Sequence, residues 1–261
     1  MGGGERRDLA SATVLLGLAL LLGLIAVAVL LVDQMGGGPS PPDGKTAAIV
    51  DQLGLTSPGP EFVESAAAML AAAGYKVDYF PGEEVTVSFY RSLPERGYDL
   101  VLLRAHSGRI VSDDLKALTD DVTIFSGESF VPGRYEDDVR ARALIDAYYS
   151  YEATDPLFGI TAEFVRSSMN GRFDGTLIIM MGCDGLRSQR IGQGFLDRGA
   201  SAFVSWSKPV SASHTDATTQ ELLEKLFLEG LDAATAVSET AAEVGPDPFY
   251  EAELRILADL R

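Results

Sequence analysis

Short, mostly apolar segments alternate with helical ones along most of the chain, and this alternation limits the folds open to it. The apolar segments occupy 46–50, 98–106, 175–181 and 200–207, and they are apolar at consecutive rather than alternate positions. Strands of that kind are buried on both faces, as in a parallel sheet covered by helices on both sides. The sequence therefore predicts an α/β fold with a mainly parallel central sheet.

The segments between these strands carry start and stop signals of helices. The segment PEFVESAAAMLAAAG begins with Pro60, which suits a first helical turn, and ends with Gly74, a common helix stop. The polar stretch 107–135 is expected to be mostly irregular surface loop. Further helices are expected at 87–97, 135–149, 187–199, 216–230, 231–245 and 247–260, and further strands at 75–80 and 121–126.

A long uncharged segment precedes this region. Residues 9–32 contain no charged residue, Asn, Gln or Pro. As a helix they would extend roughly 36 Å, enough to cross a hydrocarbon core of about 30 Å. The run is too long for a signal-peptide core and no A-x-A cleavage site follows it, so we expect an uncleaved signal anchor. Arg6 and Arg7 predict that residues 1–8 are cytoplasmic and that the C-terminal domain is extracytoplasmic.

The rest of the chain is expected to form one acidic domain. Residues 33–45 are rich in Gly and Pro and are expected to link the span to a domain at 46–261. The chain has 38 acidic against 21 basic residues and a net charge of −17. This balance argues against nucleic acid or anionic lipid head groups as partners. Membrane attachment is expected only through the N-terminal helix.

No cofactor or metal motif is present in the sequence. Two histidines and one cysteine are too few for a structural zinc site, and no Walker or dinucleotide motif occurs. Three acidic pairs, at 83–84, 113–114 and 137–138, lack the spacing of a calcium-binding loop and are expected to be a solvated acidic face. We therefore expect neither a cofactor nor a metal.

The single cysteine and one of the two histidines occupy matching positions. His106 closes the apolar run LVLLRAH, Cys183 closes LIIMMGC, and a glycine follows each within two positions. If the two strands are parallel neighbours, both side chains emerge at the same sheet edge, where an imidazole can activate a thiol whose ordinary pKa is about 8.5. The alternative is that Cys183 is a small buried residue and His106 a hydrogen-bonded strand end. The spacing alone leaves both open.

The segments YDLVLLRAHSG and TLIIMMGCDGL resemble, in that order, the two signature blocks of the caspase-like clan of cysteine peptidases. That clan includes caspases, legumains, gingipains, separases and CHAT domains. The segment QGFLDRGASAFVSWSKPVS and the helical segments after it are similar to the region after the cysteine in gingipain-type and CHAT proteins. The resemblance covers most of 46–245 and implies a caspase-like three-layer sandwich with helices on both faces of the sheet.

The resemblance also implies roles for individual residues. Cys183 would be the nucleophile and His106 the general acid and base. The backbone N–H of Cys183, with that of Ser107 or Gly108, would form the oxyanion hole. The strand FVSWS is similar to the strand that lines the substrate site in these enzymes, which makes Trp206 a candidate wall of the substrate pocket.

Several positions leave alternatives open. Ser107 stands where members of the clan commonly have Gly, and Gly182 stands where Ala is frequent. Asp184 would either select a basic substrate residue or turn away and cap the following helix. His214 would either replace His106 as the base or serve a loop or capping role, just before a helix with Asp216 as its expected N-cap.

The sequence thus predicts a membrane-anchored cysteine endopeptidase that acts on a peptide or protein through a thioester acyl-enzyme. An alternative is a binding or sensory domain on the same fold, in which the Cys–His pair is retained but unused. A third function is acyl transfer or transpeptidation through the same thioester.

Overall fold

The structure is a computed structural model that describes residues 44–111, 117–150 and 152–258. The chain divides into two compact units, 1–44 and 45–261, and the second is described here. The predicted membrane span 9–32 lies outside the described residues, as does most of the predicted linker. Within the described residues, no helix is both long and apolar enough to cross a membrane.

The described residues contain a central sheet of six strands in the order β10-β9-β8-β3-β1-β2. All neighbouring pairs are parallel except β10 with β9, which is antiparallel and closes one edge. The predicted α/β fold with a mostly parallel central sheet is confirmed. The strand bounds are β1 Thr46–Asp51, β2 Lys76–Pro81, β3 Leu100–Arg104, β8 Leu177–Met180, β9 Ala202–Trp206 and β10 Leu254–Ala258.

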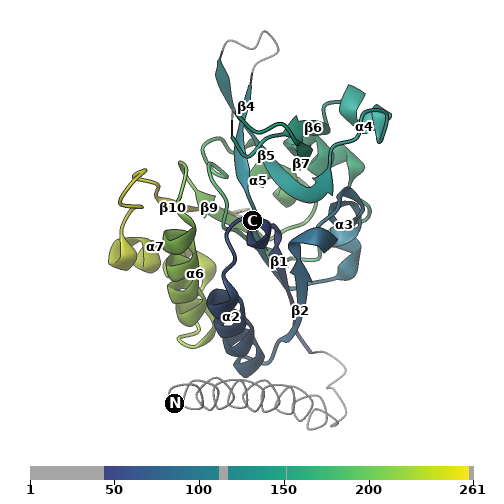
Figure 1. The fold of residues 1–261 in the computed structure, drawn as a ribbon. Helices are drawn as coiled ribbons and strands as arrows, with labels where there is room; N and C mark the ends of the chain where they lie inside the picture. Colours follow the sequence, from purple (N-terminus) through teal and green to yellow (C-terminus); the bar gives the residue numbers. More distant parts are fainter. Residues whose placement is uncertain (1–43, 112–116, 151, 259–261) are drawn as a thin grey trace, which may run out of the picture. The chain divides into compact units, whose positions relative to one another are not determined.

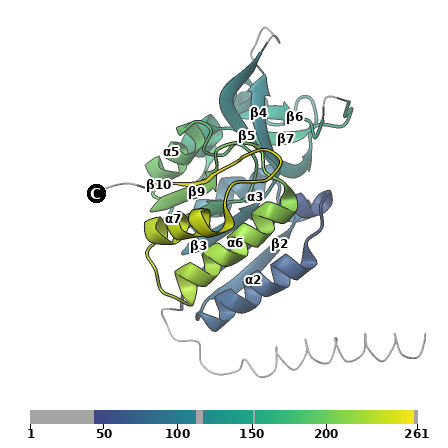
Figure 2. The same ribbon diagram turned by 90° about the vertical axis from the view of Figure 1, so that its left-hand side faces the viewer.

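Helices cover both faces of this sheet (Figure 2). Successive side chains of a strand point to opposite faces, so each strand contributes to two cores. Ala47 and Ile49 of β1 pack with α2, α6 and α7, whereas Ala48 and Val50 pack with α3 and α5. This two-sided burial explains why the strands are apolar at consecutive positions. The helix bounds are α2 Pro60–Ala72, α3 Val87–Ser92, α5 Arg190–Asp197, α6 Ala212–Phe227 and α7 Ala233–Val244.

A second, four-stranded antiparallel sheet follows β3 in the sequence and lies beyond the carboxyl ends of the central strands (Figure 1). Its order is β4-β5-β7-β6, and a short helix, α4, lies beside it. The expectation that 107–135 is mostly irregular loop is therefore wrong, because β4 and β5 pair there; the expected strand 121–126 is part of β5. The bounds are β4 Ser107–Val111, β5 Leu118–Ser129, α4 Glu136–Arg140, β6 Leu144–Ala147 and β7 Leu157–Ile160.

Two predicted helices are wrong for the same physical reason. The segment 135–149 is helical only in α4, after which Arg142 adopts a left-handed conformation with φ of 59° and the chain enters β6. The segment 247–260 contains β10 instead of a helix, with Leu254 opposite Trp206. In both segments, pairing with a neighbouring strand outweighs the local helix propensity.

Short turns complete the path of the chain at the ends of the strands. Three are 3-10 turns and one, after β7, is a π-helical turn. The first of them follows β1 directly and carries residues of the candidate site. Their bounds are Gln52–Leu55, Gly82–Glu84, Leu93–Arg96 and, for the π-helical turn, Phe164–Ser168.

Candidate active site

The carboxyl ends of β3 and β8 lie side by side in the central sheet. The strands pair in parallel, with Leu103 opposite Met180, and the Met181 N–H donates to the Leu103 carbonyl at 2.9 Å. His106 and Cys183 come shortly after these two strand ends. The catalytic interpretation requires that these two segments lie side by side at the carboxyl ends of the central strands, and they do.

A direct contact joins the segments that carry the two reactive residues. The Ser107 hydroxyl donates a hydrogen bond to the main-chain carbonyl of Cys183 at 2.6 Å. A Cβ atom at Gly182 would overlap the Ser107 Oγ and the Ala105 carbonyl oxygen. Glycine is therefore required at 182 by the close approach of the two chains, which the serine at 107 tightens further.

The Cys183 thiol is half-buried and contacts the loop that leads into α6. Its Sγ accepts a hydrogen bond from the Val210 N–H at 3.4 Å and lies 3.7 Å from the Val210 carbonyl oxygen. Burial raises the pKa of the thiol, and the carboxylates of Asp184 and Asp247 also raise it, while the Val210 N–H acts in the opposite direction. The thiol form therefore dominates at neutral pH, and the sulfur needs a base to become a nucleophile.

The His106 ring is held by its neighbours on the β1 side. Its Nε2 lies 2.6 Å from the Thr56 hydroxyl, and its main-chain N–H donates to Gln52 Oε1 at 2.8 Å. The ring of Tyr149 packs edge-on against it at 4.9 Å between centroids. Burial and the nearby charge of Arg104 lower the pKa of His106, so the imidazole is neutral at neutral pH and can accept a proton.

The Thr56 hydroxyl has two neighbours that can share its proton, the Leu53 carbonyl at 3.4 Å and His106 Nε2 at 2.6 Å. When the hydroxyl donates to Leu53, its oxygen accepts from His106, with the ring proton on Nε2 and the lone pair on Nδ1. Within the described residues no hydrogen bond engages Nδ1, and none joins the His106 ring to the Cys183 thiol.

One of the two expected oxyanion donors has no competing partner. The Cys183 main-chain N–H donates no hydrogen bond to any other described residue. Ser107 and Gly108, the candidates for the second donor, form the start of β4, where Ser107 lies opposite Ile124 of β5. Their N–H groups therefore belong to β4, which begins directly after His106.

A buried ion cluster, which the sequence reasoning missed, lies beside His106. Arg104, the last residue of β3, donates to Asp51 Oδ1 at 2.7 Å and to both carboxylate oxygens of Asp216 at 2.8 and 2.9 Å. It also donates to the Ser57 carbonyl at 3.0 Å. The cluster joins β1, β3 and α6 near the carboxyl ends of the two strands. Its signal in the sequence was an arginine inside an apolar run.

Asp216 therefore has a different role from the one predicted. The helix α6 begins at Ala212, one turn earlier than expected, with Ser211 as its N-cap residue. Asp216 is inside the helix, and its carboxylate binds Arg104.

Three other candidate residues have surroundings that differ from their predicted roles; in one of them, His214, the Nε2 atom is buried without a hydrogen-bond partner in the described structure. Trp206 is only 1% exposed, donates from Nε1 to Thr215 Oγ1 at 2.9 Å and does not line the cleft described below. His214 lies in α6 with its ring beside Trp206, at 5.3 Å between centroids. Asp184 is 4% exposed and accepts from Arg187 Nε at 2.6 Å. It caps no helix, because the following helix begins only at Arg190.

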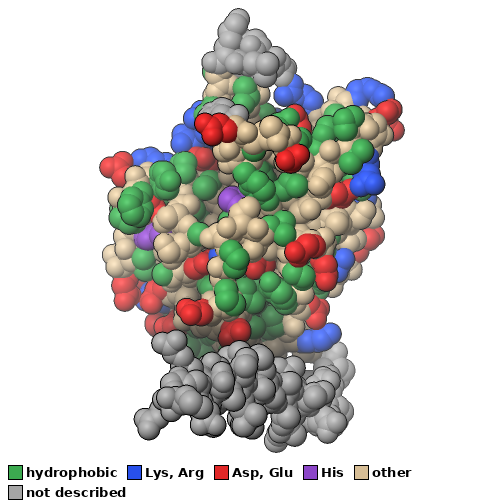
Figure 3. All heavy atoms as spheres, viewed as in Figure 1, with side chains coloured by type: hydrophobic (Ala, Val, Ile, Leu, Met, Phe, Trp, Pro, Cys, Tyr) green, Lys and Arg blue, Asp and Glu red, His purple; other side chains and the backbone are tan. Residues whose placement is uncertain are grey.

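A cleft of about 790 Å³ opens beside this edge. It lies between the four-stranded sheet and the loops that follow β8 and β9, and Gly108, Tyr149, Asp184 and Pro209 are among its lining residues. Neither Cys183 nor His106 is among its lining residues, but Tyr149, whose ring contacts His106, and Asp184, which follows Cys183 in the chain, are. On the face shown in Figure 3, histidine atoms reach the surface among hydrophobic side chains and atoms of the backbone or of other uncharged side chains.

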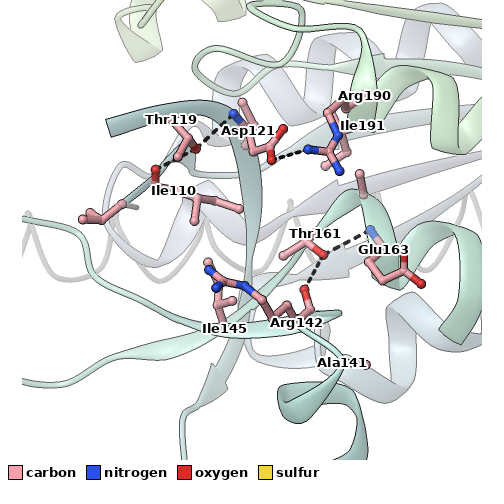
Figure 4. A pocket seen from close by; sticks show the side chains of 13 residues that line it. Ile110, Thr119, Asp121, Ala141, Arg142, Ile145, Thr161, Glu163, Arg190 and Ile191 are labelled. Atoms are coloured by element: carbon pink, nitrogen blue, oxygen red, sulfur yellow. Dashed lines mark hydrogen bonds and ion pairs between the residues drawn. The ribbon is translucent and has the colours of Figure 1, made fainter. Parts of the chain in front are cut away.

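A second cavity, of about 530 Å³, continues along β4 toward α5 (Figure 4). An ion pair of 2.6 Å between Asp121 and Arg190 closes one side. On the other side Thr161 Oγ1 donates to the Arg142 carbonyl at 2.8 Å and accepts from the Glu163 N–H at 3.1 Å. The two cavities share lining residues of β4 and β6, so together they border the small sheet.

Comparisons of the sequence with protein families and with curated proteins were made. No protein-family model matches the sequence, and no curated protein matches it significantly. What the candidate site does is therefore argued from its own geometry.

Proposed function

We propose that this chain is a cysteine endopeptidase of the caspase-like clan, with Cys183 as nucleophile and His106 as general acid and base. The observation that carries the proposal is the pairing of β3 with β8, which brings the segments of both residues to one sheet edge beside a cleft. The helix layers on both faces of the sheet are consistent with the three-layer sandwich that the sequence resemblance implies.

The contact of Thr56 with Nε2 leaves Nδ1 of His106 for the proton transfer. In the proposed dyad Nε2–H donates to Thr56 Oγ1, and Nδ1 is the atom that takes the proton from the Cys183 thiol. A base whose orientation is fixed by a third group is the usual arrangement around an activated nucleophile. Thr56 is therefore a positioning residue in the proposed site. No hydrogen bond joins the thiol and the imidazole in the described structure, so the proposal requires that substrate binding brings them together. Catalytic hydrogen bonds are often long in the free enzyme and shorten when substrate binds.

The reaction then proceeds in two halves. The Cys183 thiolate attacks the scissile carbonyl carbon, and the oxyanion that forms accepts a hydrogen bond from the Cys183 main-chain N–H. His106 returns its proton from Nδ1 to the leaving amine as the C–N bond breaks, which leaves a thioester on Cys183. Water, deprotonated by His106, hydrolyses the thioester and regenerates the thiol.

The proposed enzyme is anchored to a membrane by residues 9–32, with its catalytic domain on the extracytoplasmic side. This part of the proposal rests on the uncharged segment and on the two preceding arginines. Protease protection of a C-terminal epitope in right-side-out vesicles tests it: accessibility of the epitope is expected, and full protection would contradict it.

Labelling by a thiol-directed peptidyl acyloxymethyl ketone tests the dyad. The wild type is expected to be labelled, Cys183→Ala to be inert, and His106→Ala to react at least about a hundredfold more slowly, because the base is lost. His214→Ala is the matched control, since it removes the other histidine. Equal labelling of wild type and His106→Ala would exclude His106 as the base.

One observation favours a second candidate, a non-catalytic binding or sensory domain. In the described structure the thiol contacts Val210 and the imidazole contacts Thr56, so each reactive group already has a partner. A library of peptides distinguishes the two functions. Turnover that is abolished in Cys183→Ala would exclude the binding-only function.

A further inference from the structure

The cleft beside the dyad is placed to receive a substrate side chain. The ring of Tyr149, which lines the cleft, packs against His106, and Asp184, on its opposite wall, directly follows Cys183 in the chain. Pro209 lines it next to Val210, whose N–H contacts the thiol. A peptide whose carbonyl carbon reaches the Cys183 sulfur therefore places a neighbouring side chain in this cleft.

Its surface gathers exposed apolar groups. Ten large hydrophobic residues are exposed in the described part of the chain, and four of them, Val111, Leu118, Tyr148 and Tyr149, line this cleft. The two tyrosines are 44% and 40% exposed. Apolar surface in a concave site gains free energy when a ligand removes it from water. The walls thus favour an apolar occupant.

The charged groups of the cleft argue against a basic occupant. Two acidic residues line the cleft, Asp146 and Asp184, and both already accept hydrogen bonds; the Tyr148 hydroxyl donates to Asp146 at 3.2 Å. The Asp184 carboxylate is the acidic group closest to Cys183 in sequence, but Arg187 already binds it at 2.6 Å, and both side chains line the cleft. A lysine or arginine of the substrate would have to displace Arg187 or face its guanidinium. This placement does not favour the selection of basic residues by Asp184 that the sequence suggested.

The charges give little support for an acidic occupant either. Three arginines line the cleft, Arg109, Arg142 and Arg187, and a carboxylate that approached the first or the last would meet a guanidinium with existing partners. Arg109 donates to the Thr119 carbonyl at 2.7 Å and to the Leu118 carbonyl at 3.0 Å, so its guanidinium is held along its own hairpin. Arg187 is occupied by Asp184. A carboxylate entering the cleft would compete with these existing partners.

From these observations we infer that the cleft selects substrates with a bulky apolar side chain, aromatic or long aliphatic, next to the cleaved bond. The inference rests on the proposed peptidase function and specifies its substrate class. The side chain packs on Tyr148 and Tyr149, and the Asp184–Arg187 pair forms a neutral polar edge.

A matched set of peptidyl acyloxymethyl ketones that differ only in the side chain beside the reactive carbonyl provides the test. Phe and Leu ketones are expected to inactivate the protein at least about tenfold faster than Lys or Glu ketones, which is the discrimination typical of a hydrophobic pocket. Iodoacetamide, which carries no side chain, measures the intrinsic reactivity of Cys183.

Two variants locate the selection in the cleft. Tyr148→Ala is expected to slow the Phe ketone about tenfold and to leave the iodoacetamide rate unchanged, whereas Tyr250→Ala, an exposed tyrosine outside the cleft, changes neither. Arg187→Ala removes the partner of Asp184 and is expected to raise the rate with the Lys ketone severalfold.

The outcomes separate the two proposals. Alkylation by iodoacetamide with no reaction of any ketone would contradict the peptidase function itself. Reaction of the ketones with Lys or Glu fastest would leave the function standing and overturn the apolar selection. Equal loss of the Phe and Lys rates in Tyr148→Ala would also overturn it.

Discussion

The Ser107 hydroxyl donates a 2.6 Å hydrogen bond to the main-chain carbonyl of Cys183, so the residue after the candidate base is tied to the candidate nucleophile. In the clan that the sequence resembles, glycine commonly takes the position of Ser107, and the serine raised the question of whether the site is intact. The contact gives the serine a defined role: it fixes the distance between the ends of β3 and β8.

Ser107→Ala is therefore expected to lower the free energy of unfolding by about 0.5–1.5 kcal/mol, the usual net contribution of one hydrogen bond. Thermal denaturation of the variant beside Ser201→Ala, which removes the hydroxyl of an exposed serine, measures this. Gly182→Ala is expected to cost more, because its Cβ would overlap both Ser107 Oγ and the Ala105 carbonyl. Full stability of Gly182→Ala would contradict the close approach of the two chains.

Thr56→Val should reduce the rate of peptide cleavage by at least about tenfold with little change in KM, because Nε2–H of His106 loses its acceptor and the ring loses its orientation. Thr56→Ser keeps the hydroxyl and should restore most of the rate. A merely structural role for Thr56 would lower the melting temperature and leave the tautomer unchanged, which ¹⁵N chemical shifts of the imidazole report directly.

The lowered pKa of His106 has a consequence for stability. Between the pKa of an unfolded histidine, about 6.5, and the lower folded value, the unfolded chain binds more protons than the folded one. The contribution of His106 to stability is therefore complete above pH 6.5 and is lost as the pH falls through this window. NMR titration of the two histidines, assigned with His214→Gln, should give a pKa below 6.5 for His106; a value above 6.5 would contradict its burial.

Arg104→Met should destabilise the protein by about 3–5 kcal/mol, since it leaves the buried carboxylate of Asp51 and the partly buried one of Asp216 without their cation. Urea denaturation measures this cost. The control is Arg255→Met, which breaks an exposed ion pair with Glu253 and should change stability by less than about 1 kcal/mol. Equal effects of the two variants would show that the cluster does not brace the reactive edge.

Asp247 should affect the thiol from a distance. Although burial acts to raise it, the pKa of Asp247 is lowered to about 2 by four donors: the N–H and hydroxyl of Ser211 and the N–H groups of Phe249 and Tyr250. These bonds hold the loop whose Val210 N–H contacts Cys183. An asparagine at 247 offers only one acceptor oxygen, so one pair of donors loses its partner.

The pKa of Cys183, measured from the pH dependence of its alkylation, is therefore expected to rise in Asp247→Asn as the Val210 contact weakens. Loss of the negative charge alone would lower that pKa, so the sign of the change identifies the cause. Glu239→Gln, an equal charge change at an exposed residue of α7, is the control. A lower or unchanged pKa in Asp247→Asn would contradict the positioning role.

The parallel sheet and the placement of the segments carrying His106 and Cys183 after neighbouring strands were predictable, because consecutive apolar residues and the reactive side chains that follow them are local signals. The small sheet and β10 were not. Residues 144–147 and 254–258 become strands because a partner strand is available outside the segment itself, at 157–160 for the first and, far back in the sequence, at 202–206 for the second. The burial of Trp206 and the pairing of Asp184 with Arg187 likewise depend on packing that no local pattern specifies.

The most direct test of the central claim, that Cys183 and His106 form a peptidase dyad, is mass spectrometry of a diverse peptide library incubated with the protein. The dyad predicts new cleavage products with the wild type, none with Cys183→Ala, and at least about a hundredfold slower release with His106→Ala, while His214→Ala cleaves normally. Products that appear equally with Cys183→Ala, or none with the wild type, would contradict it.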